Sequence, residues 1–145
     1  MEEILSFSAN KLIFSEGEEA SGLFIIQSGE IICLKNNKDR LTPIYRARAG
    51  DIIGESALLS DAPHIYSAIT LNDCSVVKVS STNFVTALNE APNWVQDLTR
   101  TMISRFQNTS DLLAQNRILH DSILSEEDYP PTRENEFKKI LTSKD

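Results

Sequence analysis

The sequence predicts a mostly β protein, a jellyroll-like barrel with flanking helices and a long C-terminal helix, and three patterns indicate this. Short apolar runs recur between turn-rich segments over the first two-thirds of the chain, and strands of this length at regular spacing are typical of sandwiches and barrels. No strand–helix–strand repeat of about 30 residues is visible, so a doubly wound parallel sheet is not expected. After Ser80 the cap residues and the apolar spacing become helical.

The expected strands are bounded by turn residues. The runs at 23–26 and 31–34 are separated by a turn at Gly29, which predicts two neighbouring antiparallel strands. Residues 54–59 are expected to form a glycine turn that opens one short helical turn, which Pro63 ends because proline cannot continue a helix interior. The remaining strands are expected at 11–14, 41–48, 65–70 and 75–79.

Pro92 precedes the longest expected helix, which runs from Asn93 to about Leu124. One stripe of this helix alternates spacings of four and three, the heptad pattern of a coiled coil. The stripe consists of Leu98, Met102, Arg105, Thr109, Leu112, Asn116, Leu119 and Ile123. It predicts a parallel homodimer in which Asn116 pairs with its own copy and sets the register. The competing arrangement is a monomer in which the helix folds back on its own barrel as a lid.

These elements divide the chain into three parts: a barrel with short helices at 1–92, a dimerisation helix at 93–124, and a linker with a short tail at 125–145. Within the tail, residues 134–141 could form one amphipathic helix. Only 21 residues follow Leu124. We therefore expect no further folded domain after the long helix.

Composition excludes several classes of function. The 145 residues carry a net charge of −7, with 14 basic and 21 acidic side chains, so DNA binding is not expected, because phosphate neutralisation needs a basic surface. No apolar run approaches the roughly 20 residues that span a bilayer, and the N-terminus lacks a secretory signal. We expect a cytoplasmic protein without membrane contact, in which Cys33 and Cys74 are buried reduced thiols.

Catalytic and metal-binding motifs are missing as well. The two histidines, His64 and His120, lie far apart in the sequence and neither belongs to a nucleophile motif. The chain has no phosphate-loop lysine, no Gly-x-Ser-x-Gly motif and no Cys/His cluster with zinc spacing. We expect a protein that is not an enzyme and that holds no metal or cofactor.

One series of short motifs is more specific than the rest. In order along the chain these are residues 22–30, 50–59, 62–63 and 67–68. Together they resemble the cyclic-nucleotide-binding domain family, over about residues 7–123. Residues 105–110 resemble the central dimer helix of its bacterial catabolite-activator branch. The resemblance implies a jellyroll barrel that binds a cyclic nucleotide, with cAMP as the first candidate.

The residue types in this series suit a cyclic phosphodiester. Gly54 lets the backbone come close to a ligand, and the backbone N–H groups of Ser56 and Ala57 are free donors for an anion at the start of the short helix. Glu55 is suited to accept a charge-assisted hydrogen bond from a ribose hydroxyl. The resemblance assigns the matching glutamate to the ribose 2′-hydroxyl. The alternative is that Glu55 only caps its own helical turn.

The chain departs from the family where an arginine normally binds the phosphate. Alignment on Pro63 puts His64 in that place, and alignment on Ser67 puts Tyr66 there. Either side chain donates a single hydrogen bond without a full charge, and losing a hydrogen bond to a charged partner costs about 1.5–3 kcal/mol. The resemblance implies that the Ser67 hydroxyl is another phosphate donor. Arg46 and Arg48 lie on the preceding strand and are expected to face solvent, although one could reach in; they share a face.

Thr109 and Ser110 lie on the long helix at the family's distance from the glycine turn. The resemblance implies that this pair contacts the purine, one residue from each subunit. The alternative is an ordinary polar seam that sets the register of the helix pair. Two functions follow for the chain: a stand-alone cyclic-nucleotide sensor that signals through its dimer helix or a partner protein, or a degenerate domain that no longer binds nucleotide and acts as a protein-interaction module.

Overall fold

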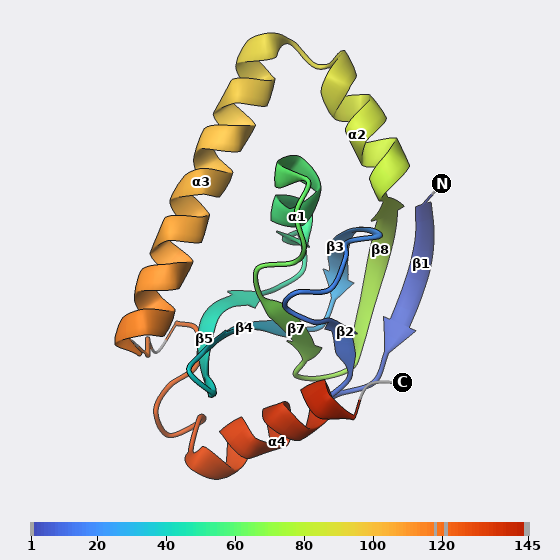
Figure 1. Cartoon of the computed structure of the whole chain (residues 1–145). Helices are drawn as coiled ribbons and strands as arrows, with labels where there is room; N and C mark the ends of the chain where they lie inside the picture. The colour runs from blue at the N-terminus through green and yellow to red at the C-terminus, as the bar shows by residue number, and fades with distance from the viewer. Residues whose placement is uncertain (1, 118, 121, 144–145) are drawn as a thin grey trace.

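The computed structural model describes residues 2–117, 119–120 and 122–143, and it consists of two four-stranded antiparallel sheets with four helices (Figure 1). One sheet has the order β1-β8-β3-β6, from the strands Glu2–Phe7, Cys74–Ser80, Gly22–Ser28 and Ile52–Ile53. The other has the order β2-β7-β4-β5, from Leu12–Phe14, Ser67–Thr70, Ile31–Asn37 and Arg40–Ala47. The helices are α1 (Glu55–Ser60), α2 (Ser81–Glu90), α3 (Asn93–Asn116) and α4 (Pro131–Thr142). The predicted jellyroll-like barrel with flanking helices and a long helix is confirmed.

The predicted pairing of the strands on either side of Gly29 is wrong. β3 pairs with β8 and β6, whereas β4 pairs with β5 and β7, so the two strands lie in different sheets. Gly29 has φ +87°, and a Cβ at this position would lie 2.4 Å from the Asp73 carbonyl oxygen. A hairpin and a sheet-to-sheet crossing use the same glycine signal, and here the chain uses the turn to cross between the sheets.

The space between the sheets is filled by one apolar core. Phe14, Phe24 and Tyr66 meet there, with the Phe14 and Phe24 ring centroids 5.8 Å apart. The other buried members are Ile26, Ile31, Cys33, Ile44, Ala47, Ile53, Ala68, Cys74 and Val76. Both cysteines are free and buried, as predicted.

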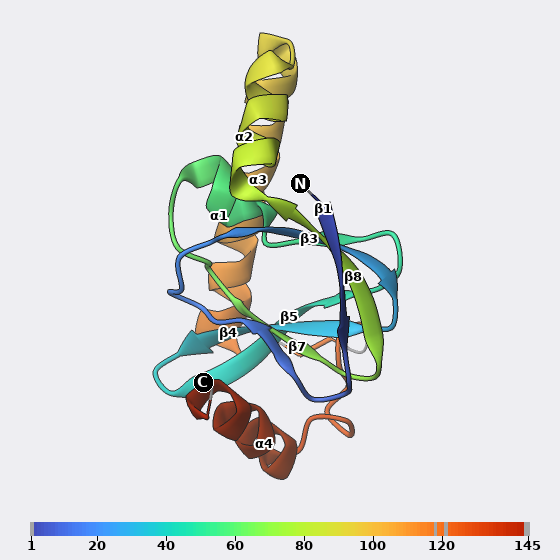
Figure 2. The ribbon, with the colours of Figure 1, turned by 90° about the vertical axis from the view of Figure 1, so that its right-hand side faces the viewer.

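A second apolar core lies on the outer face of the second sheet, where α4 covers it. Ile32, Leu34 and Ile69 of the sheet pack there against Tyr129 and against Phe137, which is fully buried. Figure 2 shows α4 at the opposite end of the molecule from α2 and the start of α3. The amphipathic helix predicted at 134–141 is confirmed, and it begins earlier, at Pro131, in the first helical turn that proline favours. The segment predicted as a linker and tail therefore forms part of the folded core.

α3 is shorter than predicted. It ends at Asn116, where Arg117 takes a left-handed conformation with φ +49°, so the expected continuation to Leu124 is wrong. Arg117 donates hydrogen bonds to the Leu41 carbonyl oxygen and to Glu134, which turns the chain toward the barrel. Leu119 and Ile123, predicted for the helical stripe, pack instead into the second core.

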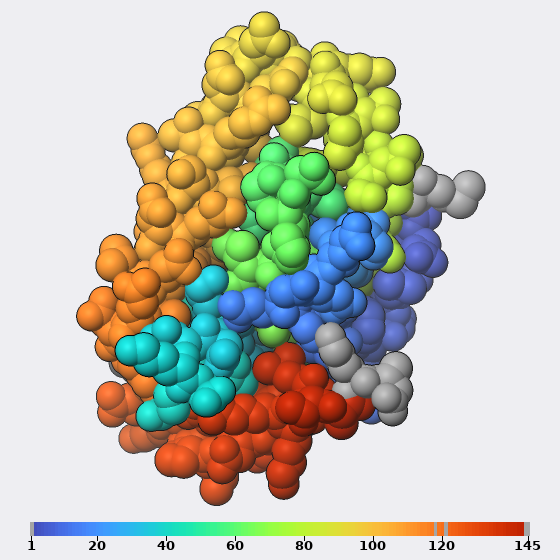
Figure 3. All heavy atoms as spheres, in the orientation of Figure 1, coloured from blue at the N-terminus to red at the C-terminus, as the bar shows by residue number. Residues whose placement is uncertain are grey.

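The rest of the predicted stripe lies on the outside of α3. All six of its members between 98 and 116 are exposed: Leu98, Met102, Arg105, Thr109, Leu112 and Asn116. The opposite side of the helix is buried at Ile103, Ser110 and Ala114, against α1, β4 and β5. Figure 3 shows the β4–β5 hairpin, in cyan, between the end of α3 and α4. No helix in the described ranges is long and apolar enough to cross a bilayer.

Candidate functional site

The site is built around Gly54, which immediately precedes α1. Gly54 has φ +84°, a conformation that glycine adopts without a steric penalty. A Cβ here would lie 3.3 Å from Cε1 of His64 and 3.5 Å from Cε2 of Phe14. The glycine thus permits both the left-handed turn and the close approach of the two rings, and its expected approach to a ligand stays a prediction.

Tyr66 binds directly to this glycine. The Gly54 N–H donates to the Tyr66 hydroxyl over 2.8 Å, and the tyrosine is 3% exposed. Its ring lies 5.5 Å from the Phe14 ring and meets Phe106 of α3 edge-on, with centroids 6.0 Å apart. Burial raises the pKa of Tyr66 well above its usual value, so the phenol is neutral and keeps a proton to donate.

His64 lies on the other side of Gly54. Its imidazole stacks on Phe14 with centroids 3.8 Å apart and an interplanar angle of 14°. Its backbone N–H donates to the Glu18 carbonyl oxygen, and its carbonyl accepts from the Gly17 N–H. Burial lowers the pKa of the imidazole, against the opposing charge of Glu18. Both residues expected at the arginine position therefore lie within the barrel beside Gly54, and neither brings a permanent charge.

Glu55 of α1 has a buried carboxylate oxygen that lacks a hydrogen-bond donor among the described residues. Its Oε2 atom is buried and accepts no hydrogen bond from any residue that the structure describes. Burial raises the pKa of Glu55, and its own backbone N–H only partly offsets this. The Oε2 atom therefore remains without a donor among the described residues. Ser56 is buried with its hydroxyl in the same situation, and Ala57 is buried beside it.

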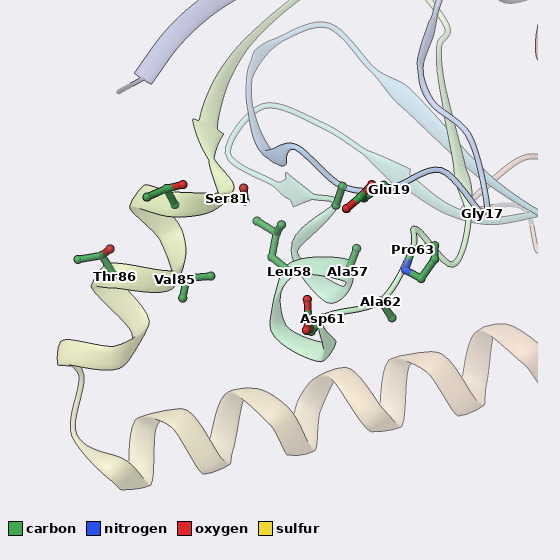
Figure 4. A pocket seen from close by; sticks show the side chains of 12 residues that line it. Gly17, Glu19, Ala57, Leu58, Asp61, Ala62, Pro63, Ser81, Val85 and Thr86 are labelled. Carbon is green, nitrogen blue, oxygen red and sulfur yellow. The ribbon is translucent and has the colours of Figure 1, made fainter.

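Two of the cavities beside α1 have candidate residues on their walls. The first, about 400 Å³, lies between α1 and α3 and includes Glu55 and Tyr66 on its wall. The rest of its lining is Tyr45, Ile52, Leu59, Leu98, Thr99, Met102, Ile103 and Phe106. The second, about 660 Å³, lies between α1, α2 and the loop at Gly17–Ala20, with the acidic Glu19 and Asp61 on its wall (Figure 4). Among the described residues, no lysine or arginine lines either cavity.

Ser67 is separated from the other candidate residues. Its hydroxyl accepts a hydrogen bond from the Glu16 N–H over 2.8 Å, and it lines a different cavity, on the side of α4. Successive side chains of an extended chain point to opposite faces, so Tyr66 lies in the inner core and Ser67 on the outer side. The sequence motif places both residues in one segment but does not distinguish these faces.

Thr109 and Ser110 also face different ways. Ser110 is 1% exposed on the buried side of α3, whereas Thr109 is exposed on the outer stripe. Arg46 and Arg48 both bind Glu30, at 2.9 and 3.0 Å, so the structure does not bring either of them to Gly54. The expectation that they face solvent holds for Arg48, which is exposed, whereas Arg46 is half-buried.

Sequence reasoning missed the contact that joins α3 to this region. Lys35 of β4 donates to the Ile65 carbonyl oxygen over 2.7 Å and pairs with Asp111 of α3 at 3.2 Å. Ile65 lies between the two candidate residues His64 and Tyr66. A lysine on a strand that ends in a polar turn carries no local signal for this role, because its partners are 30 and 76 positions away along the chain (65 − 35 and 111 − 35).

Comparisons with known proteins agree with this arrangement. Residues 4–91 match the family model of the cyclic nucleotide-binding domain. The chain is 30% identical over 82 residues to a cAMP-dependent protein kinase regulatory subunit of Neurospora crassa, an alignment covering 57% of this chain and 21% of that protein. The chain thus aligns with about a fifth of the length of that curated relative.

Solved structures show the same fold. An EAL enzyme, Bd1971, in its cAMP and cyclic-di-GMP bound form, superposes with a TM-score of 0.71 at 23% identity, over 79% of this chain and 31% of that one. The Thermus thermophilus catabolite activator protein superposes with a TM-score of 0.65 at 16% identity, over 80% of this chain and 55% of that one. The family match over more than half of the chain and the matching barrel lead to one conclusion: this protein belongs to the cyclic nucleotide-binding domain family.

Proposed function

We propose that this domain binds a cyclic nucleotide, with cAMP as the first candidate, in the cavity between α1 and α3, and that it acts as a non-catalytic sensor in the cytoplasm. The observation that carries the proposal is the Glu55 carboxylate, whose buried Oε2 lacks a donor among the described residues on the wall of that cavity. Buried polar atoms in native proteins are nearly always hydrogen-bonded. A ribose hydroxyl would supply the missing donor.

The phosphate end of the site would bind without a fixed cation. His64 and the Tyr66 hydroxyl lie beside Gly54, and the N–H groups of Ser56 and Ala57 begin the short helix. The absence of a bidentate arginine costs about 1.5–3 kcal/mol, roughly one to two decades in affinity. We therefore expect micromolar rather than nanomolar binding of cAMP.

The output of the sensor would run through α3. The exposed apolar members of its stripe are Leu98, Met102 and Leu112, each more than half exposed. A second copy of the same helix would cover them in a parallel homodimer, and Thr109 on this stripe would then face the partner subunit. Phe106 and the Lys35–Asp111 pair connect α3 to the binding region, so occupancy of the cavity would bias the position of the helix.

A second candidate function has its own supporting observation. The Tyr66 hydroxyl already takes the Gly54 N–H, and no lysine or arginine in the described ranges lines the cavity. Both features suit a domain that has kept the fold and lost the ligand. Such a domain would act as a protein-interaction module through the exposed stripe of α3.

Calorimetric titration with cAMP, cyclic GMP and a cyclic dinucleotide tests the two functions. We expect cAMP to bind, and Glu55→Gln to weaken binding by about 10- to 150-fold, the equivalent of a lost charge-assisted hydrogen bond of about 1.5–3 kcal/mol. The matched control is Glu127→Gln, at an exposed glutamate far from the cavity along the chain. If no cyclic nucleotide binds at millimolar concentration, the sensor is excluded and the interaction module remains.

A further inference from the structure

We propose that Tyr66 is a built-in competitor for the ligand: its hydroxyl holds the Gly54 N–H, a bound cyclic nucleotide displaces it, and the displaced ring moves α3. The inference rests on the proposed function and adds to it the residue that sets affinity and passes the signal on. Tyr66 is thus a positioning residue that acts through α1 and α3.

The first step is the hydrogen bond itself. The Tyr66 hydroxyl lies 2.8 Å from the Gly54 nitrogen, and the tyrosine is almost fully buried. A single N–H makes one good hydrogen bond at a time, so a ligand oxygen that approaches Gly54 must replace the hydroxyl. Gly54 itself is buried and Tyr66 lines the cavity, so a ligand in the cavity reaches this N–H only after the hydroxyl moves.

The second step is the fate of the displaced hydroxyl. Tyr66 and Glu55 line the same cavity, and the charge of Glu55 acts on the Tyr66 phenol. The phenol donates no hydrogen bond to any residue that the structure describes, although its oxygen accepts one from Gly54. Once the ring turns, the hydroxyl loses its hydrogen bond to Gly54, and this loss opposes ligand binding. The exchange breaks one hydrogen bond and forms another, which makes it reversible.

The third step connects the ring to α3. Tyr66 meets Phe106 edge-on, and the same cavity is lined by Met102 and Ile103 of that helix. Interiors are packed closely, so a turned aromatic ring must be accommodated by its neighbours. Lys35 holds the Ile65 carbonyl beside Tyr66, so the backbone there is fixed and the movement falls on the ring and on α3.

The test uses Tyr66→Phe, which keeps the ring and removes the hydroxyl. We expect the dissociation constant for cAMP to fall three- to tenfold, because the ligand no longer competes for the Gly54 N–H. The control is Tyr129→Phe, which removes a hydroxyl that is equally buried but binds the Leu41 carbonyl under α4. This control should leave the dissociation constant unchanged.

A second readout follows the helix. Trp94, the single tryptophan of the chain, lies near the start of α3 and is 68% exposed. We expect cAMP to change its fluorescence, and Tyr66→Phe to show part of that change without ligand. A role limited to general stability would move the thermal midpoint but not this signal.

The outcomes separate the inference from the proposed function. Unchanged or weaker cAMP binding by Tyr66→Phe overturns the inference while the sensor stands. Binding by Tyr66→Phe alone, with none by the unmutated protein, supports a competitor strong enough to block the site. If none of the three proteins binds, both the inference and the sensor fall.

A measurement on the unmutated protein covers the case in which the variant fails to fold. In a titration followed by NMR, cAMP is expected to shift the Gly54 amide together with the ring resonances of Tyr66 and Phe106. Shifts confined to Glu55 and Ala57, with the Tyr66 ring unmoved, would overturn the inference.

Discussion

Glu134, which is buried, and Glu55, which is half-buried, have opposite environments on opposite sides of the barrel. Glu134 of α4 accepts hydrogen bonds from Arg40, Arg117 and the Leu41 N–H. Burial alone would raise its pKa, but these partners outweigh burial and lower it. Glu55 of α1 is half-buried, its Oε2 atom has no hydrogen-bond partner among the described residues, and burial raises its pKa. The first carboxylate connects α4 to β5 and to Arg117, whereas the second has one oxygen without a donor among the described residues.

The same contrast extends to the surroundings of each residue. Around Glu134, the second core is closed by Tyr129 and Phe137. Around Glu55 lie a cavity and the exposed apolar stripe of α3. Polar groups that are hydrogen-bonded and apolar groups that are buried within the fold stabilise it. Polar groups without partners and exposed apolar groups can instead be covered by a bound molecule, which makes binding more favourable.

The largest expected effect tests the dimer. Met102→Glu with Leu112→Glu puts two like charges on each helix at exposed apolar sites of the stripe. We expect the dissociation constant of the parallel homodimer, measured by sedimentation equilibrium, to rise at least a hundredfold. Thr142→Glu, at the end of α4, is the control. A wild-type monomer at ~100 μM, above the nanomolar-to-micromolar range of specific dimers, would contradict the dimer and leave the stripe to another partner.

His64→Arg is expected to tighten cAMP binding by roughly ten- to a hundredfold, because it restores a charged, bidentate partner for the phosphate beside Gly54. Calorimetric titration measures the change, and His120→Arg at the exposed second histidine is the control. Equal affinity of His64→Arg and wild type would place the phosphate away from His64 and would weaken the contrast between the two sides of the barrel.

Stability should respond to the two glutamates in opposite directions. Glu134→Gln is expected to lower the free energy of unfolding by about 3 kcal/mol, the lower end for breaking a buried charge pair, because Arg40 is half exposed. Glu55→Gln is expected to leave it unchanged or to raise it by up to about 1 kcal/mol, because a buried charge is removed. Urea unfolding measures both. Equal losses would show that Glu55 also has a structural partner.

The dependence of stability on pH should separate the sites further. The pKa of His64 is lowered below 6.5 in the folded state, so the unfolded chain takes up a proton first as the pH falls, and stability is lost below about pH 6.5. The pKa of Glu134 lies below 4.5, so its contribution is present above that pH and is lost only in stronger acid.

Because His64 takes up one proton, it can change the free energy of unfolding by at most about 1.4 kcal/mol per pH unit. In His64→Gln the thermal midpoint should depend less on pH between pH 6.5 and 5. In Glu134→Gln it should depend less on pH only below pH 4.5. An unchanged profile in His64→Gln would mean that the histidine is not held neutral in the fold.

The sequence by itself determined the features that depend on local pattern. The short apolar runs between turns predict the barrel, and the glycine at 54 predicts the turn that precedes the short helix α1. The exposed stripe of α3 up to Asn116 follows from heptad spacing. These signals span a few residues, so they can be interpreted without knowing what packs against them.

Only the tertiary structure decided which groups meet across the chain. Gly29 takes β4 into the other sheet, and Arg117 ends α3 because Leu41 and Glu134 accept its hydrogen bonds, 76 and 17 positions away. Tyr66 reaches Gly54 from the inner face while Ser67 faces outward. Each of these outcomes is a competition among distant donors, acceptors and apolar surfaces, and a local pattern carries no information about which distant partner wins.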